Sequence, residues 1–212
     1  MDTKTEDDIA AEIVRDITVG VDGTSVRAGI IGEIGCSWPW PENEQKVLRA
    51  AAVAQRQTGA PLMVHPGRHE TAPFMIIDVL KKAGADLSHT VICHVERTFF
   101  DLSLNHKVAE AGCYLEYDLF GWETSYYPLA PIDMPNDGQR LGQIARLIAD
   151  GLQDRILLSH DICHKFRLGR YGGHGYGHIL RNVVPKMRQK GFREEHIRTL
   201  LVENPKRMLQ FV

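Results

Sequence analysis

The feature that most constrains the fold is a short apolar run, ending near a polar residue, that recurs along the chain. The first run spans residues 28–35 and carries Glu33 near its end, and later runs end in His65, His94 and Asp161. The first three of these residues are about 30 positions apart, the length of a βα unit. Because helical patterns fill the intervals, the chain predicts a parallel sheet covered by helices.

Glycine and proline mark the limits of these segments. Apart from Glu33 itself, the first run is apolar and bounded by glycines, which is typical of a strand buried on both faces. An open doubly wound sheet and part of a (β/α)₈ barrel both fit this alternation. The predicted strands are residues 26–35, 61–65, 90–94, 113–119 and 155–161; the predicted helices are 6–16, 42–58, 71–84, 101–111, 139–149, 179–189 and 193–201, with a last short helix opened by Asn204 and Pro205.

Composition places the chain among ordinary globular proteins. It has 212 residues, 43% hydrophobic and 25% charged, enough for one sizeable domain. A net charge of -2 gives no strong field, so neither nucleic acid nor a membrane is expected as a partner. Without a signal peptide or a long apolar run, we expect a cytoplasmic protein. Four scattered cysteines are expected to be buried thiols: Cys36, Cys93, Cys113 and Cys163.

The run ends carry residues that suit a divalent metal ion. Glu33, His65, His94 and Asp161 all follow the carboxyl ends of predicted parallel strands, where sites of α/β proteins form. Two imidazoles and two carboxylates form a ligand set for zinc, and Asp161 could also accept a proton from a metal-activated water. Taken singly, each residue has a plainer interpretation: a hydrogen-bonded histidine, a Glu–Arg pair or an Asp that caps a turn.

Aromatic and basic residues near the strand ends suggest a substrate pocket. Trp38 and Tyr117 could line it, as could Trp40, Tyr126 and Tyr127, or all five could be core aromatics. Arg68 could meet an anionic group or lie on the surface. The long loop at residues 120–138 exceeds what packing requires, and the Gly-rich loop at 171–178 is interpreted as a flexible pocket wall, since it lacks phosphate-loop spacing.

Several motifs together resemble the phosphotriesterase family of the amidohydrolase superfamily, in particular its phosphotriesterase-related branch. The likeness runs from about residue 26 to the end of the chain. The motifs are GIIGEIG at 29–35, VHPGR at 64–68, CH at 93–94, YLEYDLFG at 114–121, SHDI at 159–162 and YGGHGY at 171–176.

The resemblance implies a TIM-type (β/α)₈ barrel with two metal ions, most often zinc. By position, Glu33 resembles the carboxylate that bridges the metals, and His65 and His94 resemble ligands of the more exposed ion. Asp161 resembles the residue that holds the buried ion and shuttles a proton. The implied activity is metal-dependent hydrolysis of small-molecule esters, lactones or N-acyl amides. Apart from the resemblance, the pocket residues Trp38, Arg68 and Tyr117 are the expected substrate contacts.

One family motif is absent: no His-x-His pair precedes Glu33. The five βα units resemble barrel strands four to eight, so an incomplete barrel is expected, with residues 1–25 as a connection and 26–212 as a partial hydrolase barrel. Its open edges predict association into a homo-oligomer, and the site should be impaired, with one ion or none. The competing hypotheses are a non-catalytic fragment with a binding or regulatory role, and a flavodoxin-like binding domain.

Overall fold

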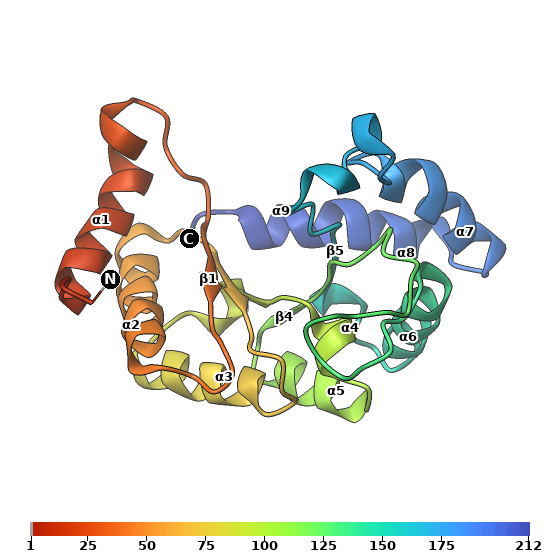
Figure 1. Ribbon diagram of the computed structural model, residues 1–212, viewed down its shortest axis with the longest axis horizontal. Helices are drawn as coiled ribbons and strands as arrows, with labels where there is room; N and C mark the ends of the chain where they lie inside the picture. Colours follow the sequence, from red (N-terminus) through yellow and green to blue (C-terminus); the bar gives the residue numbers. More distant parts are fainter. Residues whose placement is uncertain (1) are drawn as a thin grey trace. The chain divides into compact units, whose positions relative to one another are not determined.

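The computed structural model describes residues 2–212, and its elements alternate between strands and helices (Figure 1). The strands are hydrogen-bonded in the order β1-β2-β3-β4-β5. The pairings β1–β2, β2–β3 and β4–β5 are parallel. The strands are β1 (Ile31–Gly35), β2 (Leu62–His65), β3 (Thr90–Ile92), β4 (Tyr114–Tyr117) and β5 (Ile156–Leu158); the α-helices are α1 (Glu6–Thr18), α2 (Glu42–Thr58), α3 (Ala72–Lys82), α4 (Val95–Thr98), α5 (Ser103–Glu110), α6 (Asp137–Ala149), α7 (Val184–Gln189), α8 (Glu194–Arg198) and α9 (Asn204–Leu209).

The described residues form two compact units. The first contains the chain up to Cys93, together with Lys107–Tyr114 and Lys206–Val212. The second contains His94–His106 and Leu115–Pro205. The units therefore interleave along the sequence, whereas the boundary predicted between residues 25 and 26 stays a prediction.

In the first unit, α1 packs lengthwise on α2 (Figure 1). The helix begins at a capping box made by Thr5 and Asp8, as its polar start and acidic first turn favour. Ile9 of α1 packs in a small cluster with Ala50 of α2. Helix α2 ends at Gly59, which adopts a left-handed conformation (φ 67°), so the predicted glycine C-cap is confirmed.

The prediction for the first strand is wrong in length and in burial. The strand begins only at Ile31, and of its five residues Ile31 alone is fully buried. The physical reason is its position: among the described residues, β1 pairs only with β2 and forms an edge of the sheet. As a consequence, the Glu33 side chain is 34% exposed rather than buried. Gly32 is required beside it, since a Cβ there would lie 2.4 Å from the Met63 carbonyl oxygen.

In the second unit, the long loop after β4 has a packed core of its own. Leu119, Tyr127 and Met134 form this core, with Trp122 packed against it. The loop leads into α6, which begins at a capping box made by Asn136 and Gln139. Internal packing of this kind gives a long loop a defined shape, which a pocket wall requires.

The end of the second unit departs from the prediction at Asn204. This residue was expected to cap a separate helix, but α8, a π-helical turn (Thr199–Glu203) and α9 follow one another without a break. The Asn204 side-chain amide donates to the carbonyl oxygens of Gln153 and Ile156, each at 2.7 Å. A π-helical turn (Ile179–Val183) likewise leads into α7, whose first turn contains Pro185.

Three of the four cysteines match the prediction. Cys36, Cys93 and Cys113 are buried and form no disulfide within residues 2–212. Cys163 was expected in the core but is exposed, because it lies in the loop after β5. Within residues 2–212, no helix is both long and apolar enough to cross a membrane.

Candidate metal site and adjoining pocket

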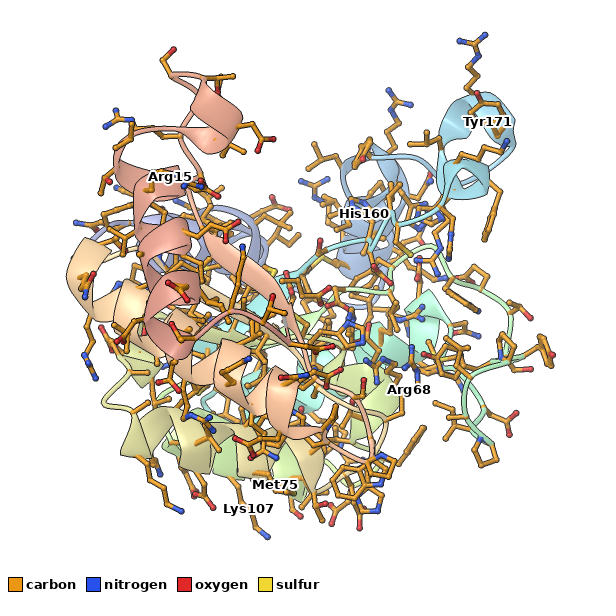
Figure 2. All side chains as sticks on the ribbon, turned by 60° about the vertical axis from the view of Figure 1, so that its left-hand side comes forward. Arg15, Arg68, Met75, Lys107, His160 and Tyr171 are labelled. Atoms are coloured by element: carbon orange, nitrogen blue, oxygen red, sulfur yellow. The ribbon has the colours of Figure 1, made fainter. Side chains whose placement is uncertain are left out.

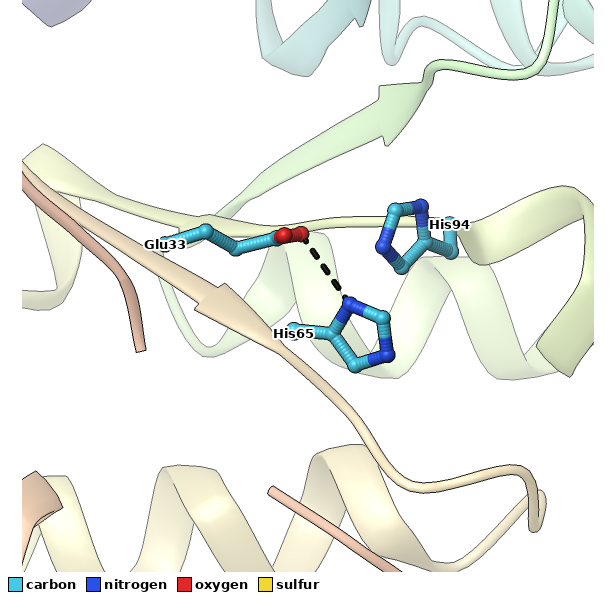
Figure 3. Close-up of side chains that lie close together, drawn as sticks. All are labelled: Glu33, His65 and His94. Carbon is cyan, nitrogen blue, oxygen red and sulfur yellow. Dashed lines mark ion pairs between the residues drawn. The ribbon is translucent and has the colours of Figure 1, made fainter. Parts of the chain in front are cut away.

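Glu33 and His65 lie on neighbouring strands at their carboxyl ends. The register pairs Ile34 with Val64 and Gly35 with His65, which brings the two side chains to the same edge. His65 Nδ1 lies 3.3 Å from Glu33 Oε1, and both side chains are partly exposed (Figure 3). A carboxylate and an imidazole are therefore presented together where a ligand can reach them.

His94 follows directly on the strand end at Cys93, whose backbone N–H donates to the Val64 carbonyl of β2. Its backbone is left-handed (φ 55°), and its side chain is 3% exposed. The Asp118 carboxylate contacts both the backbone and the side chain of His94. Its Oδ2 accepts a hydrogen bond from the His94 backbone N–H at 2.9 Å, and its Oδ1 lies 2.7 Å from His94 Nδ1. With the Nδ1 proton directed to the carboxylate, Nε2 carries the lone pair, the arrangement in which a histidine binds a metal.

The three side chains form one candidate ligand group. A ligand atom from each of Glu33, His65 and His94 lies within 4.8 Å of the others, and Figure 3 shows the carboxylate directed toward both rings. One carboxylate and two imidazoles suit Zn²⁺ and similar divalent ions. Three of the four predicted ligands therefore come together in the structure.

Asp161, the fourth predicted ligand, is held by an arginine. It has a left-handed backbone (φ 44°), and its Oδ2 lies 3.2 Å from Arg167 Nη1. No metal-ligand group within residues 2–212 includes Asp161. Its role as a ligand and proton acceptor stays a prediction.

The three residues predicted to contact substrate differ in exposure. Trp38 is 40% exposed and stacks on His69 with ring centroids 4.2 Å apart. Arg68 is exposed. Tyr117 is 1% exposed, and burial raises the pKa of its phenol. Substrate contact therefore stays a prediction for all three, and burial favours a packing role for Tyr117.

A pocket of about 410 Å³ lies within the second unit, between the loop after β4 and the loop after β5. Gly172, Gly173 and His174 line it, so the Gly-rich loop does form a pocket wall. Tyr126 also lines it, as one of the aromatic residues considered for a pocket. Sequence reasoning missed three other lining residues, Trp122, Phe166 and Arg167. The signal that could have found them is the presence of aromatic and basic residues in two loops long enough to have a function.

Three histidines gather in the same unit. The ring centroids of His160, His174 and His178 are 5.4 to 6.4 Å apart. His178 Nε2 is 2.6 Å from Asp137 Oδ2. His160 lies at the base of the loop after β5, and Tyr171 lies at its outer end (Figure 2). Burial, followed by the neighbouring histidines, lowers the pKa of His160 to about 4 and also lowers that of His174.

This cluster predicts a loss of stability in mild acid. In the unfolded chain, His160 takes up a proton below about pH 6.5, whereas in the folded chain it does so only near pH 4. The free energy of unfolding should therefore fall as the pH is lowered from 6.5 toward 4. In chelator-treated protein, His160→Asn should flatten this fall in guanidinium unfolding curves measured at pH 6.5, 5.5 and 4.5. An unchanged slope would contradict the assignment.

The fold and the ligand group together define a class: an α/β protein with a candidate divalent-metal site at the ends of parallel strands. Comparison with known proteins identifies the family. The model of the phosphotriesterase family matches residues 2–209, and the chain belongs to this family. The predicted α/β fold of incomplete barrel type is confirmed, since the matched structures are barrels of this family.

The relatives include proteins named as hydrolases. The N-acetyltaurine hydrolase of Homo sapiens is 54% identical over 200 residues, covering 94% of this chain and 57% of its own length. The phosphotriesterase-related protein of Nematostella vectensis is 47% identical over 206 residues, covering 97% and 59%. This chain therefore spans a little under two thirds of the curated relatives that it matches.

Solved structures agree with this result. A resiniferatoxin-binding protein from Rhodobacter sphaeroides superposes with a TM-score of 0.93 at 40% identity, covering 99% of this chain and 58% of that one. A phosphotriesterase homology protein from Escherichia coli, complexed with phosphate in its active site, gives 0.87 at 33% identity, covering 99% and 69%.

Proposed function

We propose that this chain carries a metal-dependent hydrolase site for small molecules, formed by Glu33, His65 and His94. The observation that supports it most strongly is the meeting of these three side chains, with ligand atoms within 4.8 Å of one another, at the ends of successive strands. Sites of α/β barrel proteins form at that end of the sheet. A zinc ion bound there would activate water and polarise the bond to be cleaved.

The protein residues have two proposed roles, which are to hold the metal ion and to accept a proton. Glu33 and His65 face one another from adjacent strands, and Asp118 fixes the His94 ring with Nε2 as its ligand nitrogen. Asp161, held by Arg167, is proposed to act as the proton acceptor and as a further ligand. Trp38, Arg68 and Tyr117 are proposed as substrate contacts.

We propose an N-acyl amide as the substrate class. Several relatives that cover nearly all of this chain are named N-acetyltaurine hydrolases, and the structural neighbours include a lactonase from Listeria monocytogenes. Because no His-x-His motif occurs in the chain, we expect a single-ion site of reduced activity. A purely binding or regulatory role is the alternative.

We also propose that the chain forms homo-oligomers and that it is cytoplasmic. The exposed edge of β1 suggests association into homo-oligomers, since an unpaired edge can add a strand from another copy. The four cysteines without a disulfide fit a cytoplasmic location.

The experiment is a hydrolysis assay on the purified chain. N-acetyltaurine and a γ-lactone are incubated with zinc-loaded protein, with chelator-treated protein and with chelator-treated protein to which zinc is returned. We expect release of taurine that chelation removes and zinc restores. Zinc binding without any turnover would favour the non-catalytic alternative.

A further inference from the structure

The pocket in the second unit is lined by both aromatic and charged residues. Trp122, Tyr126 and Phe166 are among its lining residues, and its volume of about 410 Å³ admits a small molecule. Its backbone is built for close packing: a Cβ at Gly173 would lie 2.2 Å from the Arg167 carbonyl oxygen, and one at Gly121 would enter the His174 ring. The loops after β4 and β5 therefore pack closely where they form this pocket.

Arg167 is the cationic side chain that lines this pocket, and it is 6% exposed. Its guanidinium carbon lies 4.5 Å over the Trp122 ring. Both of its hydrogen bonds, to the Asp161 carboxylate and to the Asp161 backbone carbonyl, leave from Nη1. Within the described residues, Nε and Nη2 thus remain as donors for a ligand oxygen.

Two further polar atoms of the pocket residues have no hydrogen-bond partner among the described residues. These are the buried Trp122 Nε1 and His174 Nε2. A buried donor without an acceptor costs about 1–3 kcal/mol, so these two atoms leave hydrogen-bonding capacity in the residues that line the pocket. The acidic lining residue, Glu123, accepts from the Asp137 backbone N–H at 2.9 Å, so its charge is directed to the start of α6.

We infer that this pocket binds an oxygen-rich monoanion, a sulfonate or carboxylate on a short aliphatic arm, through Arg167 and Trp122. Burial lowers the pKa of His174, so this residue contributes a hydrogen bond rather than a charge. The aromatic walls exclude water and strengthen the ion pair with Arg167. The inference rests on the proposed function in one respect: Arg167 also holds Asp161, the proposed proton acceptor, so the anion would be the charged end of the substrate.

Binding is tested first, without turnover. Ethanesulfonate and propionate are titrated calorimetrically into the full chain, into Arg167→Gln and into Arg170→Gln, an exposed arginine of the same loop that does not line the pocket. We expect Arg167→Gln to weaken both anions by about tenfold or more, the scale of a charged hydrogen bond, and Arg170→Gln to leave them unchanged. Comparison of the two anions shows which head group the pocket prefers.

Kinetics then separate anion recognition from support of Asp161. In Arg167→Gln, we expect kcat/KM to fall for both substrates, because Arg167 also holds Asp161, but to fall about tenfold or more further for N-acetyltaurine than for the uncharged N-ethylacetamide. Arg167→Lys serves if the first variant does not fold, and it should give an intermediate loss of anion binding. Equal losses for both substrates, or anion binding indifferent to Arg167, would overturn the inference. Arg167-dependent binding in a chain that hydrolyses nothing would support the inference and contradict the proposed function.

Discussion

Replacement of His65 by asparagine is expected to reduce the proposed hydrolysis of N-acetyltaurine by more than about 100-fold, since loss of even an indirect metal-holding partner costs about 10–100-fold. The expected loss is large because His65 supplies one of only three ligand side chains in the group. Asparagine keeps a polar side chain of similar size beside Glu33 but has no imidazole lone pair. The measurement is kcat/KM at saturating zinc, together with the unfolding midpoint.

The matched control for His65→Asn is His89→Asn. His89 belongs to the same unit but lies before β3, where Nδ1 is 3.0 Å from Asp86 Oδ2. We expect this control to retain wild-type activity. If the two variants lost activity equally, or if His65→Asn lost activity only because it unfolded, the assignment of His65 would be wrong.

Replacement of Arg140 by methionine is expected to lower the free energy of unfolding by about 3–5 kcal/mol, the usual cost of breaking a buried ion pair. The Arg140 side chain is fully buried in the second unit. Its Nη1 lies 3.0 Å from Asp137 Oδ1, and its Nε lies 3.4 Å from Glu96 Oε1. Without the guanidinium, both carboxylates lose their buried cation. Denaturant titration at pH 8 provides the measurement.

The pH dependence gives this prediction a second test. Burial, with the charge of Asp118, raises the pKa of Glu96 to about 7, and Arg140 opposes that rise. In Arg140→Met, Glu96 should stay protonated to higher pH, so the loss of stability should be smaller at pH 6 than at pH 8. Arg140→Met/Glu96→Gln should lose less than the two single variants added together. Arg146→Met, at an exposed position on the same helix, should change stability by no more than about 0.5 kcal/mol.

The elements that the sequence predicts well are those that local chemistry determines. Helix α2 and the glycine after it follow from an amphipathic pattern and a left-handed C-cap, and β2 follows from an apolar run in which Leu62 and Val64 are buried. The histidines at the strand ends were predictable for the same reason. Parallel strands place their carboxyl ends at one edge of the sheet whatever the detailed packing is.

The errors come from features that depend on distant parts of the chain. Periodicity cannot show that β1 is an edge strand, so it cannot show that Glu33 is partly exposed. Asn204 resembles a helix cap in its own sequence, and only the position of the Gln153 carbonyl reveals its other role. The pocket around Arg167 is built from two irregular loops, whose meeting no sequence pattern specifies.

Whether Glu33, His65 and His94 bind a divalent ion can be measured directly as zinc binding. Equilibrium dialysis against zinc is performed on the wild-type chain and on Glu33→Gln, His65→Asn, His94→Asn and the control His89→Asn. We expect stable binding of zinc by the wild type and by the control, and binding weakened by more than about 100-fold in each of the other three. Zinc binding that all five proteins share, or that the folded wild type lacks, would contradict the proposed site.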